Sequence, residues 1–360
     1  MSMMSCCPFC SQQVLSIDLQ RHANSHFEDQ DDDQQHHHVQ LVDHIQSQTL
    51  PCSPQPSSTN LMSLLKNCLD TEPAATTSFL SGHVDHFHSI DFEDVGWGCG
   101  WRNIQMLTSH LLFQRPEAKP LLFGGSGFVP DIPSLQTWLE VAWNKGFDAP
   151  GANHFNRKIS GKRAWIGTTE CAALFRSFGL RACIVDFTTS STGTSSSKST
   201  PKLVGPMDRY LNRPHHDASS SNSNNNKCVG EIVKGHQLLF NWVRSYFSDS
   251  NMTTKSGVIV TQKAPLYFQH DGHSRTIVGI QLKRLPNGTD QHNLLILDPA
   301  HKTQVLESCL SKKFGWQRYI KRGVHTLKKT EYQLCYIDPG IATGAEMQKL
   351  KTLDSTHFEF

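Results

Sequence analysis

A cysteine stands at the start of a segment with helical spacing of its apolar residues. Cys99 directly precedes a stretch in which Ile104, Leu107 and Leu111 fall on one face of a helix. A thiol at a helix N-terminus feels the positive end of the helix dipole, which favours the thiolate and lowers the pKa of the thiol. The position suits a catalytic nucleophile, but most cysteines near a helix start are small buried hydrophobic residues. A matching base would favour the first interpretation.

A candidate base lies far downstream. His273 sits between two predicted strands, residues 266–268 and 276–280, and a third predicted strand, 294–297, ends directly before Asp298. Antiparallel pairing of these neighbours would bring Asp298 beside His273. A carboxylate there would orient the imidazole and stabilise its charged form after the thiol loses a proton. The order Cys, His, Asp is that of papain-like thiol hydrolases, although a chain with 20 histidines offers many such sets.

The N-terminus carries a separate metal-ligand pattern. Cys7, Cys10, His22 and His26 are spaced C-x2-C-x11-H-x3-H, close to the spacing with which two thiolates and two imidazoles complete a tetrahedral Zn²⁺ shell. A finger this short would be unfolded without its structural zinc. Its predicted helix, residues 16–22, has one Arg and one Asp, too little positive charge to grip phosphates. We therefore expect a protein-binding finger.

Elements of two kinds must position the downstream residues. Helical patterns dominate first: the helix at Cys99 should end near Arg115, and further helices are predicted at 135–143 and 170–178. A strand is predicted at 180–186, and strand patterns dominate the later part of the chain. The fold class is therefore α/β (α+β), a papain-like core with a helical first half and an antiparallel sheet in the second half.

Composition limits the function classes. The 360 residues, 37% of them hydrophobic, can build a substantial core. The formal net charge of +2 argues against nucleic acid as a partner. No apolar run approaches the roughly 20 residues that cross a bilayer, and the first residues lack a signal-peptide core. An odd number of scattered cysteines, 11, suits reduced thiols, so we expect a protein of the cytoplasm or nucleus.

Four segments carry a family resemblance. They are Gly96–Asn103, Trp165–Glu170, Gly272–Thr276 and Leu297–Pro299. Together they resemble the peptidase family that contains the ubiquitin-fold-modifier proteases, and within it the zinc-finger branch of ZUFSP-type deubiquitinases. The resemblance extends from about residue 80 to about 340. It implies that Cys99 is the nucleophile, His273 the general base and Asp298 the residue that orients the base.

The chain departs from the modifier-specific relatives at the acid–base residues. Those relatives carry their histidine two residues after the aspartate, where this chain has Ala300; His301 lies one residue further on. The departure favours His273 as the base.

A second departure concerns the oxyanion. The modifier-specific relatives have a Tyr twelve residues before the cysteine, where this chain has Phe87. The oxyanion hole must therefore use the backbone N–H of Cys99 and a second donor, for which His86 or His88 is a candidate.

The resemblance to deubiquitinases suggests substrate-binding residues. Ubiquitin ends in Leu-Arg-Leu-Arg-Gly-Gly, so its protease needs a slot too narrow for side chains and carboxylates for the arginines. Trp97, Gly98 and Trp101 suit the slot, and Asp148 and Glu170 are candidates for the arginine partners. The alternative for the two carboxylates is surface charge or, for Glu170, a helix cap.

We divide the chain into a finger at 1–27, a linker with short amphipathic helices at 28–78, a papain-like protease domain at 79–345 and a tail at 346–360. Residues 188–228, rich in Ser, Asn, Thr and Pro, are expected to be a disordered insertion. One linker helix, at 61–69, has an apolar stripe that either packs on the protease domain or grips ubiquitin.

The favoured function is a thiol-dependent deubiquitinase that hydrolyses isopeptide bonds in polyubiquitin chains, with the finger and linker helices binding ubiquitin. It needs no cofactor for catalysis. A protease for the ubiquitin-fold modifier is the alternative with the same chemistry, and Ala300, Phe87 and the finger disfavour it. From other classes, a catalytically silent ubiquitin-binding adaptor and a zinc-finger nucleic-acid binder remain. The intact Cys, His and Asp set argues against the adaptor, and the charge balance argues against the nucleic-acid binder.

Overall fold

The computed structural model describes residues 4–6, 12–15, 22, 61–188, 236–248 and 257–359. Three of the four expected zinc ligands, Cys7, Cys10 and His26, lie outside these residues. So do the linker up to residue 60 and, apart from Thr188, the whole insertion expected at 188–228.

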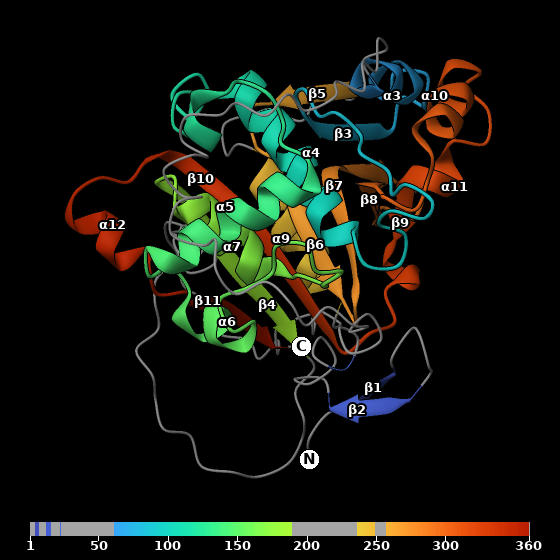
Figure 1. Ribbon diagram of the computed structural model, residues 1–360. Coiled ribbons are helices and arrows are strands. Elements are labelled where there is room, and N and C mark those ends of the chain that lie inside the picture. The colour runs from blue at the N-terminus through green and yellow to red at the C-terminus, as the bar shows by residue number, and fades with distance from the viewer. Residues whose placement is uncertain are drawn as a thin grey trace, which may run out of the picture.

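A nine-stranded sheet forms the centre of the molecule (Figure 1). Its main path runs β11-β4-β10-β6-β7-β3-β5, while β8 pairs with β7 and β9 pairs with β8. The strands are β3 (Thr76–Ser81), β4 (Leu180–Thr188), β5 (Gly257–Thr261), β6 (Leu266–His270), β7 (His273–Arg284), β8 (Asp290–Leu297), β9 (Lys321–Gly323), β10 (Glu331–Ile341) and β11 (Ser355–Glu359).

The sheet is mixed, whereas the sequence predicted an antiparallel one. The predicted pairing of β6 with β7 and of β7 with β8 is antiparallel, as expected. Two pairs at the edges of the sheet are parallel, β3 with β5 and β11 with β4. The parallel edges arise because β3 comes from before the helical half and β11 from the end of the chain, and hydrophobic alternation does not encode such distant pairings.

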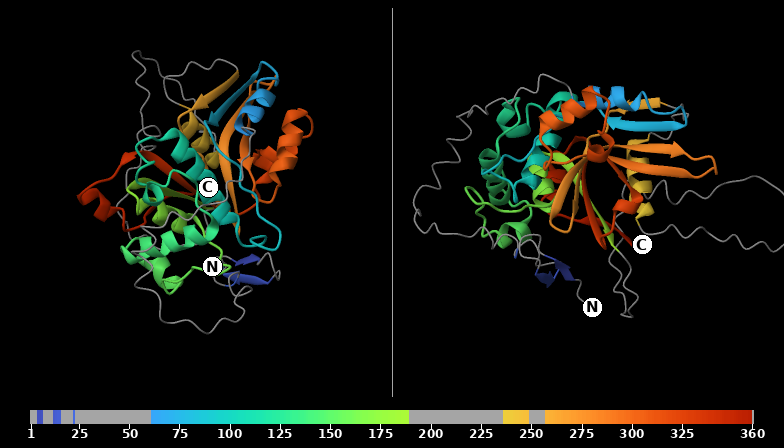
Figure 2. Two further views of the ribbon diagram at one scale, coloured as in Figure 1. Left: turned by 45° about the horizontal axis from the view of Figure 1, so that its top comes forward. Right: turned by 90° about the vertical axis from the view of Figure 1, so that its right-hand side faces the viewer.

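Helices cover both faces of the sheet (Figure 2). One face carries α4, α5 and α7 and, at one end of the sheet, α3, α10 and α11; α9 covers the opposite face. The helices are α3 (Leu61–Leu69), α4 (Cys99–Gln114), α5 (Ile132–Asn144), α6 (Ala149–His154), α7 (Thr168–Arg176), α9 (Gln237–Phe247), α10 (Thr303–Ser311), α11 (Gln317–Ile320) and α12 (Ala345–Lys349). The described residues include no helix long and apolar enough to cross a bilayer.

Strand β10 shows how the two faces are filled. Cys335 and Ile337 lie in the core beneath α4, α5 and α7, while Leu334 and Tyr336 lie in the core beneath α9. Successive side chains of a strand point to opposite faces, so a strand covered on both faces has no polar side. The continuous apolar runs of the later strands therefore mark a sheet with helices on both faces.

The helix α3 packs on the protease core. Its side chains Leu61, Leu65 and Leu69 are buried in a cluster with Leu306 and Leu310 of α10. Of the two roles considered for this stripe, packing is the one that the structure adopts, and burial removes those leucines from any contact with a partner. The role in ubiquitin binding assigned to this linker helix is therefore not supported.

The ends of the chain differ from the expected division into domains. The residues expected to form a tail contribute α12 and the edge strand β11, which pairs with β4 from Ser355 to Glu359. At the other end, β1 (Met4–Cys6) and β2 (Gln13–Leu15) form an antiparallel hairpin. The connection between these two strands contains Cys7 and Cys10, as the first half of a zinc finger would.

Candidate active site

Cys99 is the first residue of α4 and lies against the sheet. Its sulfur lies near the side chain and the backbone of Ser274 in β7. Burial raises the pKa of Cys99, and the contacts with Ser274 lower it by less. The sequence predicted a lowered pKa from the helix dipole; in the folded protein the loss of solvent around the sulfur outweighs the favourable contacts.

A buried polar bridge fixes α4 to β7. The side chain of Asn103 donates to Ser274 Oγ at 2.9 Å and accepts from Thr276 Oγ1 at 2.8 Å. Asn103 lies one helical turn after Cys99, so this bridge sets how α4 is rotated against the strand. The thiol of Cys99 is thereby held at a defined point beside Ser274.

A buried ion pair fixes the segment before α4. Arg102 donates through Nε and Nη2 to the two carboxylate oxygens of Asp94, at 3.0 and 2.7 Å. Asp94 also accepts from the backbone N–H of Ile90 at 2.7 Å. Two-point Arg–carboxylate contacts are strong and geometrically specific. The sequence analysis did not predict this ion pair, although Asp94 and Arg102 lie on either side of the start of the predicted helix, eight residues apart.

His273 is the first residue of β7 and is exposed. Among the described residues, no hydrogen bond joins its ring to Cys99 or to Asp298. The ring of His270 lies beside it, with the ring centres 5.9 Å apart. The pKa of His273 is lowered, first by loss of solvent around part of the ring and then by the charge of Arg275. The imidazole is therefore the neutral, proton-accepting form over a wider pH range than usual.

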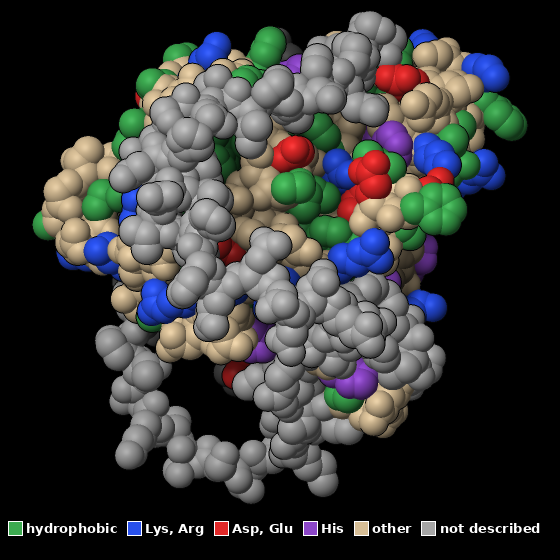
Figure 3. All heavy atoms as spheres, in the orientation of Figure 1, with side chains coloured by type: hydrophobic (Ala, Val, Ile, Leu, Met, Phe, Trp, Pro, Cys, Tyr) green, Lys and Arg blue, Asp and Glu red, His purple; other side chains and the backbone are tan. Residues whose placement is uncertain are grey.

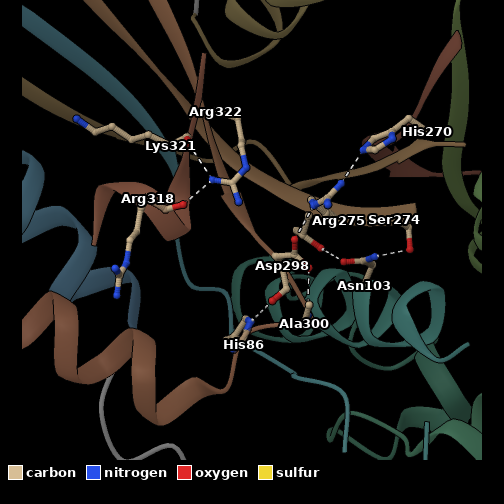
Figure 4. A network of polar contacts seen from close by, with 11 residues as sticks. His86, Asn103, His270, Ser274, Arg275, Asp298, Ala300, Arg318, Lys321 and Arg322 are labelled. Atoms are coloured by element: carbon tan, nitrogen blue, oxygen red, sulfur yellow. Dashed lines mark hydrogen bonds and ion pairs between the residues drawn. The ribbon is translucent and has the colours of Figure 1, made fainter. Parts of the chain in front are cut away.

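Asp298 follows β8 directly and its carboxylate is occupied by other groups (Figure 4). Arg275 Nε donates to one oxygen at 2.6 Å, and the backbone N–H of Ala300 donates to the other at 3.0 Å. Burial raises the pKa of Asp298, but the charge of Arg275 and the hydrogen bonds from Ala300 and Arg275 together bring it below its usual value. Arg275 also donates to Nε2 of His270 at 2.6 Å, and burial lowers the pKa of that histidine to about 3. A neutral His270 can accept this bond.

The histidines considered as oxyanion donors have other partners. Both ring nitrogens of His86 are engaged, one with Thr303 Oγ1 at 2.9 Å and the other with the backbone oxygen of Asp298 at 3.2 Å. His88 Nδ1 likewise lies 2.9 Å from Thr303 Oγ1. Burial lowers the pKa of His86 to about 4. Both rings therefore brace the backbone that follows Asp298.

His301 and Phe87 lie beside this region. The ring of His301 stands edge-on to Tyr319, with the ring centres 5.0 Å apart, and its backbone N–H donates to the Asp298 carbonyl at 3.0 Å. Phe87 is partly buried against the cluster that α3 and α10 form. Neither side chain has a described contact with Cys99.

Of the three residues expected to form a narrow slot, the two tryptophans are buried and the glycine lies against Asp94. Trp101 is 0% exposed and its indole donates to the Ala164 carbonyl, so it belongs to the core and cannot line a slot. Trp97 is also largely buried, but Gly98 has no room for a side chain, because a Cβ there would collide with the Asp94 carboxylate. The glycine at this position thus has a structural cause.

Asp148 and Glu170 both cap helices. Asp148 accepts from the Gly151 N–H at the start of α6, and Glu170 accepts from the Gly167 N–H at the start of α7, at 2.7 Å. Both carboxylates are buried, and burial is the main reason why the pKa of each is raised. The cap considered for Glu170 is therefore present. One oxygen of Asp148, Oδ2, is buried and has no hydrogen-bond partner in the described structure.

The described residues contain no cluster of three or more His, Cys, Asp or Glu side chains placed to hold a metal. Three of the four expected zinc ligands lie outside those residues. Within the finger the structure describes the hairpin of β1 and β2 together with residues 12 and 22, and the antiparallel register from Cys6↔Gln13 to Met4↔Leu15 fits a finger with its thiolates in the connection.

Known proteins resemble this chain over differing shares of its length. Zinc finger-containing ubiquitin peptidase 1 of Rattus norvegicus is 36% identical over 270 residues, which cover 74% of this chain and 38% of that protein. Ubiquitin carboxyl-terminal hydrolase mug105 of Schizosaccharomyces pombe is 29% identical over 287 residues, which cover 79% of this chain and 92% of that protein. Ufm1-specific protease 1 of Mus musculus is 35% identical over 107 residues, 29% of this chain and 40% of that protein.

The match to the zinc-finger-containing relative covers well under half of that protein, 38% of its length. The family model for Peptidase family C78 matches residues 74–335. This range begins just before β3 and contains Cys99, His273 and Asp298, that is, the helix-borne thiol and the two strand-borne groups of a papain-like core. The chain therefore belongs to peptidase family C78.

Proposed function

We propose that this chain is a cysteine-type peptidase that acts on ubiquitin conjugates, with Cys99 as nucleophile, His273 as general base and Asp298 as the residue that orients the base. The observation that carries the proposal is the thiol of Cys99 at the N-terminus of α4, next to Ser274, the residue that follows His273 in β7. The similarity to the ubiquitin peptidase and the ubiquitin hydrolase supports ubiquitin as the modifier.

The reaction begins from a neutral thiol and a neutral imidazole, because the pKa of Cys99 is raised and that of His273 is lowered. As the sulfur attacks the carbonyl carbon of the terminal glycine, the thiol proton passes to His273. The C–N bond then breaks and His273 returns the proton to the leaving lysine amine. Water, activated by His273, hydrolyses the thioester, which releases a carboxylate and restores Cys99.

The oxyanion needs two donors. The backbone N–H of Cys99, at the start of α4, is the first. For the second we favour Gln269, which lies directly opposite Ser274 in the register of β6 and β7, so that both side chains share one face. Its side-chain oxygen accepts from the Thr168 N–H at 3.1 Å, and its amide nitrogen is the group that we assign to the oxyanion.

The substrate tail would enter beside Gly98. Asp148 and Glu170 remain candidates for its arginines, since their charges interact and Asp148 has one buried oxygen without a partner. An arginine that reached this pair would satisfy that oxygen and lower both pKa values. The caps at α6 and α7 would then serve binding as well as helix formation.

The finger would add a second contact with polyubiquitin. Cys7, Cys10, His22 and His26 would hold one zinc ion, which would supply folding energy to the β1–β2 hairpin and take no part in hydrolysis. A finger tethered by a long linker raises affinity for chains by increasing the local concentration of the next ubiquitin. Cys7→Ser should release the zinc, measured by a chromophoric chelator, and weaken binding of long chains more than binding of one ubiquitin.

The test of the activity uses two probes, ubiquitin and the ubiquitin-fold modifier, each with an electrophile in place of its C-terminal carboxylate. We expect the ubiquitin probe to form one covalent adduct, seen as a mass increase, and Cys99→Ala to form none. Cys309→Ala is the matched control, because this thiol is also only partly buried and should leave labelling intact. An adduct with the modifier probe alone would favour the modifier-specific function, and no adduct with either would favour the silent adaptor.

A further inference from the structure

One aromatic residue in the segment that precedes Cys99 is fully exposed to solvent. Phe92 is 99% exposed, and its backbone φ of 67° lies in the left-handed region. A bulky residue there is strained, and exposure of a whole phenyl ring to water is unfavourable. Strain of this kind persists where the surrounding structure enforces it, and it concentrates at binding and catalytic sites.

The surrounding structure does enforce it. The segment from Asp91 to Val95, here named the 91–95 loop, is fixed from inside by the buried Asp94–Arg102 pair. It is fixed at its start by the Ser89 N–H, which donates to the Pro299 carbonyl at 2.8 Å. The loop is therefore tied both to α4 and to the backbone that follows Asp298.

The loop presents one apolar surface with an acidic rim. Phe92 and Val95, 99% and 56% exposed, supply the apolar part, and the exposed side chains of Asp91 and Glu93 flank Phe92. Asp91 forms one exposed ion pair, with Lys302 at 2.9 Å. Figure 3 shows acidic and hydrophobic side chains next to one another over the segment that precedes α4. An aromatic centre with a charged rim is the usual anatomy of a protein-binding site.

The position of the loop identifies what it would bind. Two consecutive turns join it to the nucleophile, with the Asp94 N–H donating to Ile90 and the Gly98 N–H donating to Asp94. Because these turns keep the loop next to the start of α4, a substrate whose C-terminal tail reaches Cys99 can bring its folded domain to this loop. The apolar centre and acidic rim are complementary to an apolar patch with basic residues at its edge.

We propose that the 91–95 loop is the docking surface for the folded domain of the ubiquitin-type substrate, with Phe92 as its anchor. This inference rests on the proposed function. The rigid loop presents Phe92 in one conformation, so little conformational entropy is lost when the substrate covers it. The left-handed backbone conformation of Phe92 points the ring toward solvent. Backbone strain at Phe92 is the energetic cost of keeping the ring there instead of packing it against the protein.

The test compares two substrates that share a leaving group. One is full-length ubiquitin with a C-terminal fluorogenic amide, and the other is the tail peptide Leu-Arg-Leu-Arg-Gly-Gly with the same amide. For Phe92→Gly we expect the ratio of kcat/KM for ubiquitin to kcat/KM for the peptide to fall roughly tenfold, mainly through KM. The same variant should have a higher Tm than wild type, because glycine adopts a positive φ without strain.

Phe314→Ala is the matched control, since Phe314 is 83% exposed but lies beyond α10, and the ratio should stay within about twofold of wild type. Glu93→Lys should also lower the ratio, and more so at low ionic strength. A Phe92→Gly ratio within twofold of wild type would overturn the inference while leaving the proposed function intact. An equal loss on both substrates would show that the loop only supports the catalytic site, which also overturns it. Wild-type protein that cleaves neither substrate would overturn the proposed function and the inference together.

Discussion

The two halves of the candidate active site differ in how firmly they are built. The nucleophile half is held by buried polar contacts: Asp94 with Arg102 before the helix, and Asn103 with Ser274 and Thr276 within it. In the acid–base half, by contrast, His273 is exposed and Asp298 is bound by Arg275.

The difference indicates which residue of the active site is aligned only when the substrate binds. His273 follows a tight turn in which Asp271 and Gly272 both have positive φ. His273 forms the last pair of β7 with His270 of β6, so a small rotation at this turn would move the imidazole and disturb only that terminal pair. Catalytic hydrogen bonds are often long in the absence of substrate and tighten on binding. We infer that the thiol is positioned before substrate binds and that the base is aligned afterwards.

The largest effect is expected from removal of the nucleophile. Cys99→Ala should lower kcat on a ubiquitin substrate roughly a thousandfold or more, because the attacking atom is lost. Ubiquitin binding, measured by calorimetry, should persist, since the contacts proposed for the substrate lie elsewhere. Turnover close to wild type would contradict the assignment of the nucleophile.

The two histidines near Asp298 should differ sharply. His273→Ala should lower kcat/KM by roughly 10²–10⁴-fold, the usual contribution of a general base. His301→Ala should change it by less than about threefold, because its ring packs on Tyr319 and has no described contact with Cys99. If the two variants exchanged ranks, the base would be the histidine that follows Asp298, as in the modifier-specific relatives.

The strength of the buried Asp94–Arg102 pair before α4 can be measured as a change in the free energy of unfolding. Asp94→Ala leaves Arg102 buried without its partner, which should cost about 3–5 kcal/mol of unfolding free energy. Glu117→Gln removes a pair with Arg115 in which the carboxylate is exposed, so it should cost less than about 1 kcal/mol. Urea unfolding of both variants gives the comparison, and equal losses would mean that the Asp94 clamp is no stronger than a surface pair.

A smaller effect is expected from loosening the acid–base half. Arg275 lowers the pKa of His273, so Arg275→Gln should raise that pKa. The base must be neutral, and activity is lost as the pH falls through its pKa. The acid limb of the kcat/KM profile should therefore move to higher pH in the variant. The groups facing His273 are Arg275, His270, Asp271, Asp298 and Lys329.

Arg284→Gln is the control for this shift, because Arg284 lies at the far end of the same strand and is exposed. An acid limb that stays in place, or that moves to lower pH, would show that Arg275 does not tune the base.

Several parts of the fold could be predicted from local pattern. The helix after Cys99 ends at Gln114, before Arg115 and Pro116, as the proline required. The helix predicted at 61–69 has the same bounds in the structure. The strands around His273 and their antiparallel pairing are also as predicted. These features depend on residue type and on near neighbours, which a single sequence displays.

Other parts could not be predicted in the same way. Trp101 was expected in a substrate slot and lies in the core, because a helix start offers no sign of which face will be covered. The last strand, β11, was expected to be a tail, and its partner β4 lies far away in sequence. Arg275 was not considered, although it lies two residues from the proposed base and binds the carboxylate of Asp298.

The sequence by itself indicated the family, through four segments that resemble it, and the α/β class, through the periods of helix and strand. The roles of Cys99, His273 and Asp298 are what the resemblance implies, and they stay a prediction. Only the tertiary structure decided the ionisation of Cys99, the partner of Asp298 and the outward position of Phe92. A pKa depends on how many atoms exclude water around a group, and an ion pair depends on which distant strands become neighbours. Both the pKa and the ion pair are therefore determined only in the folded protein.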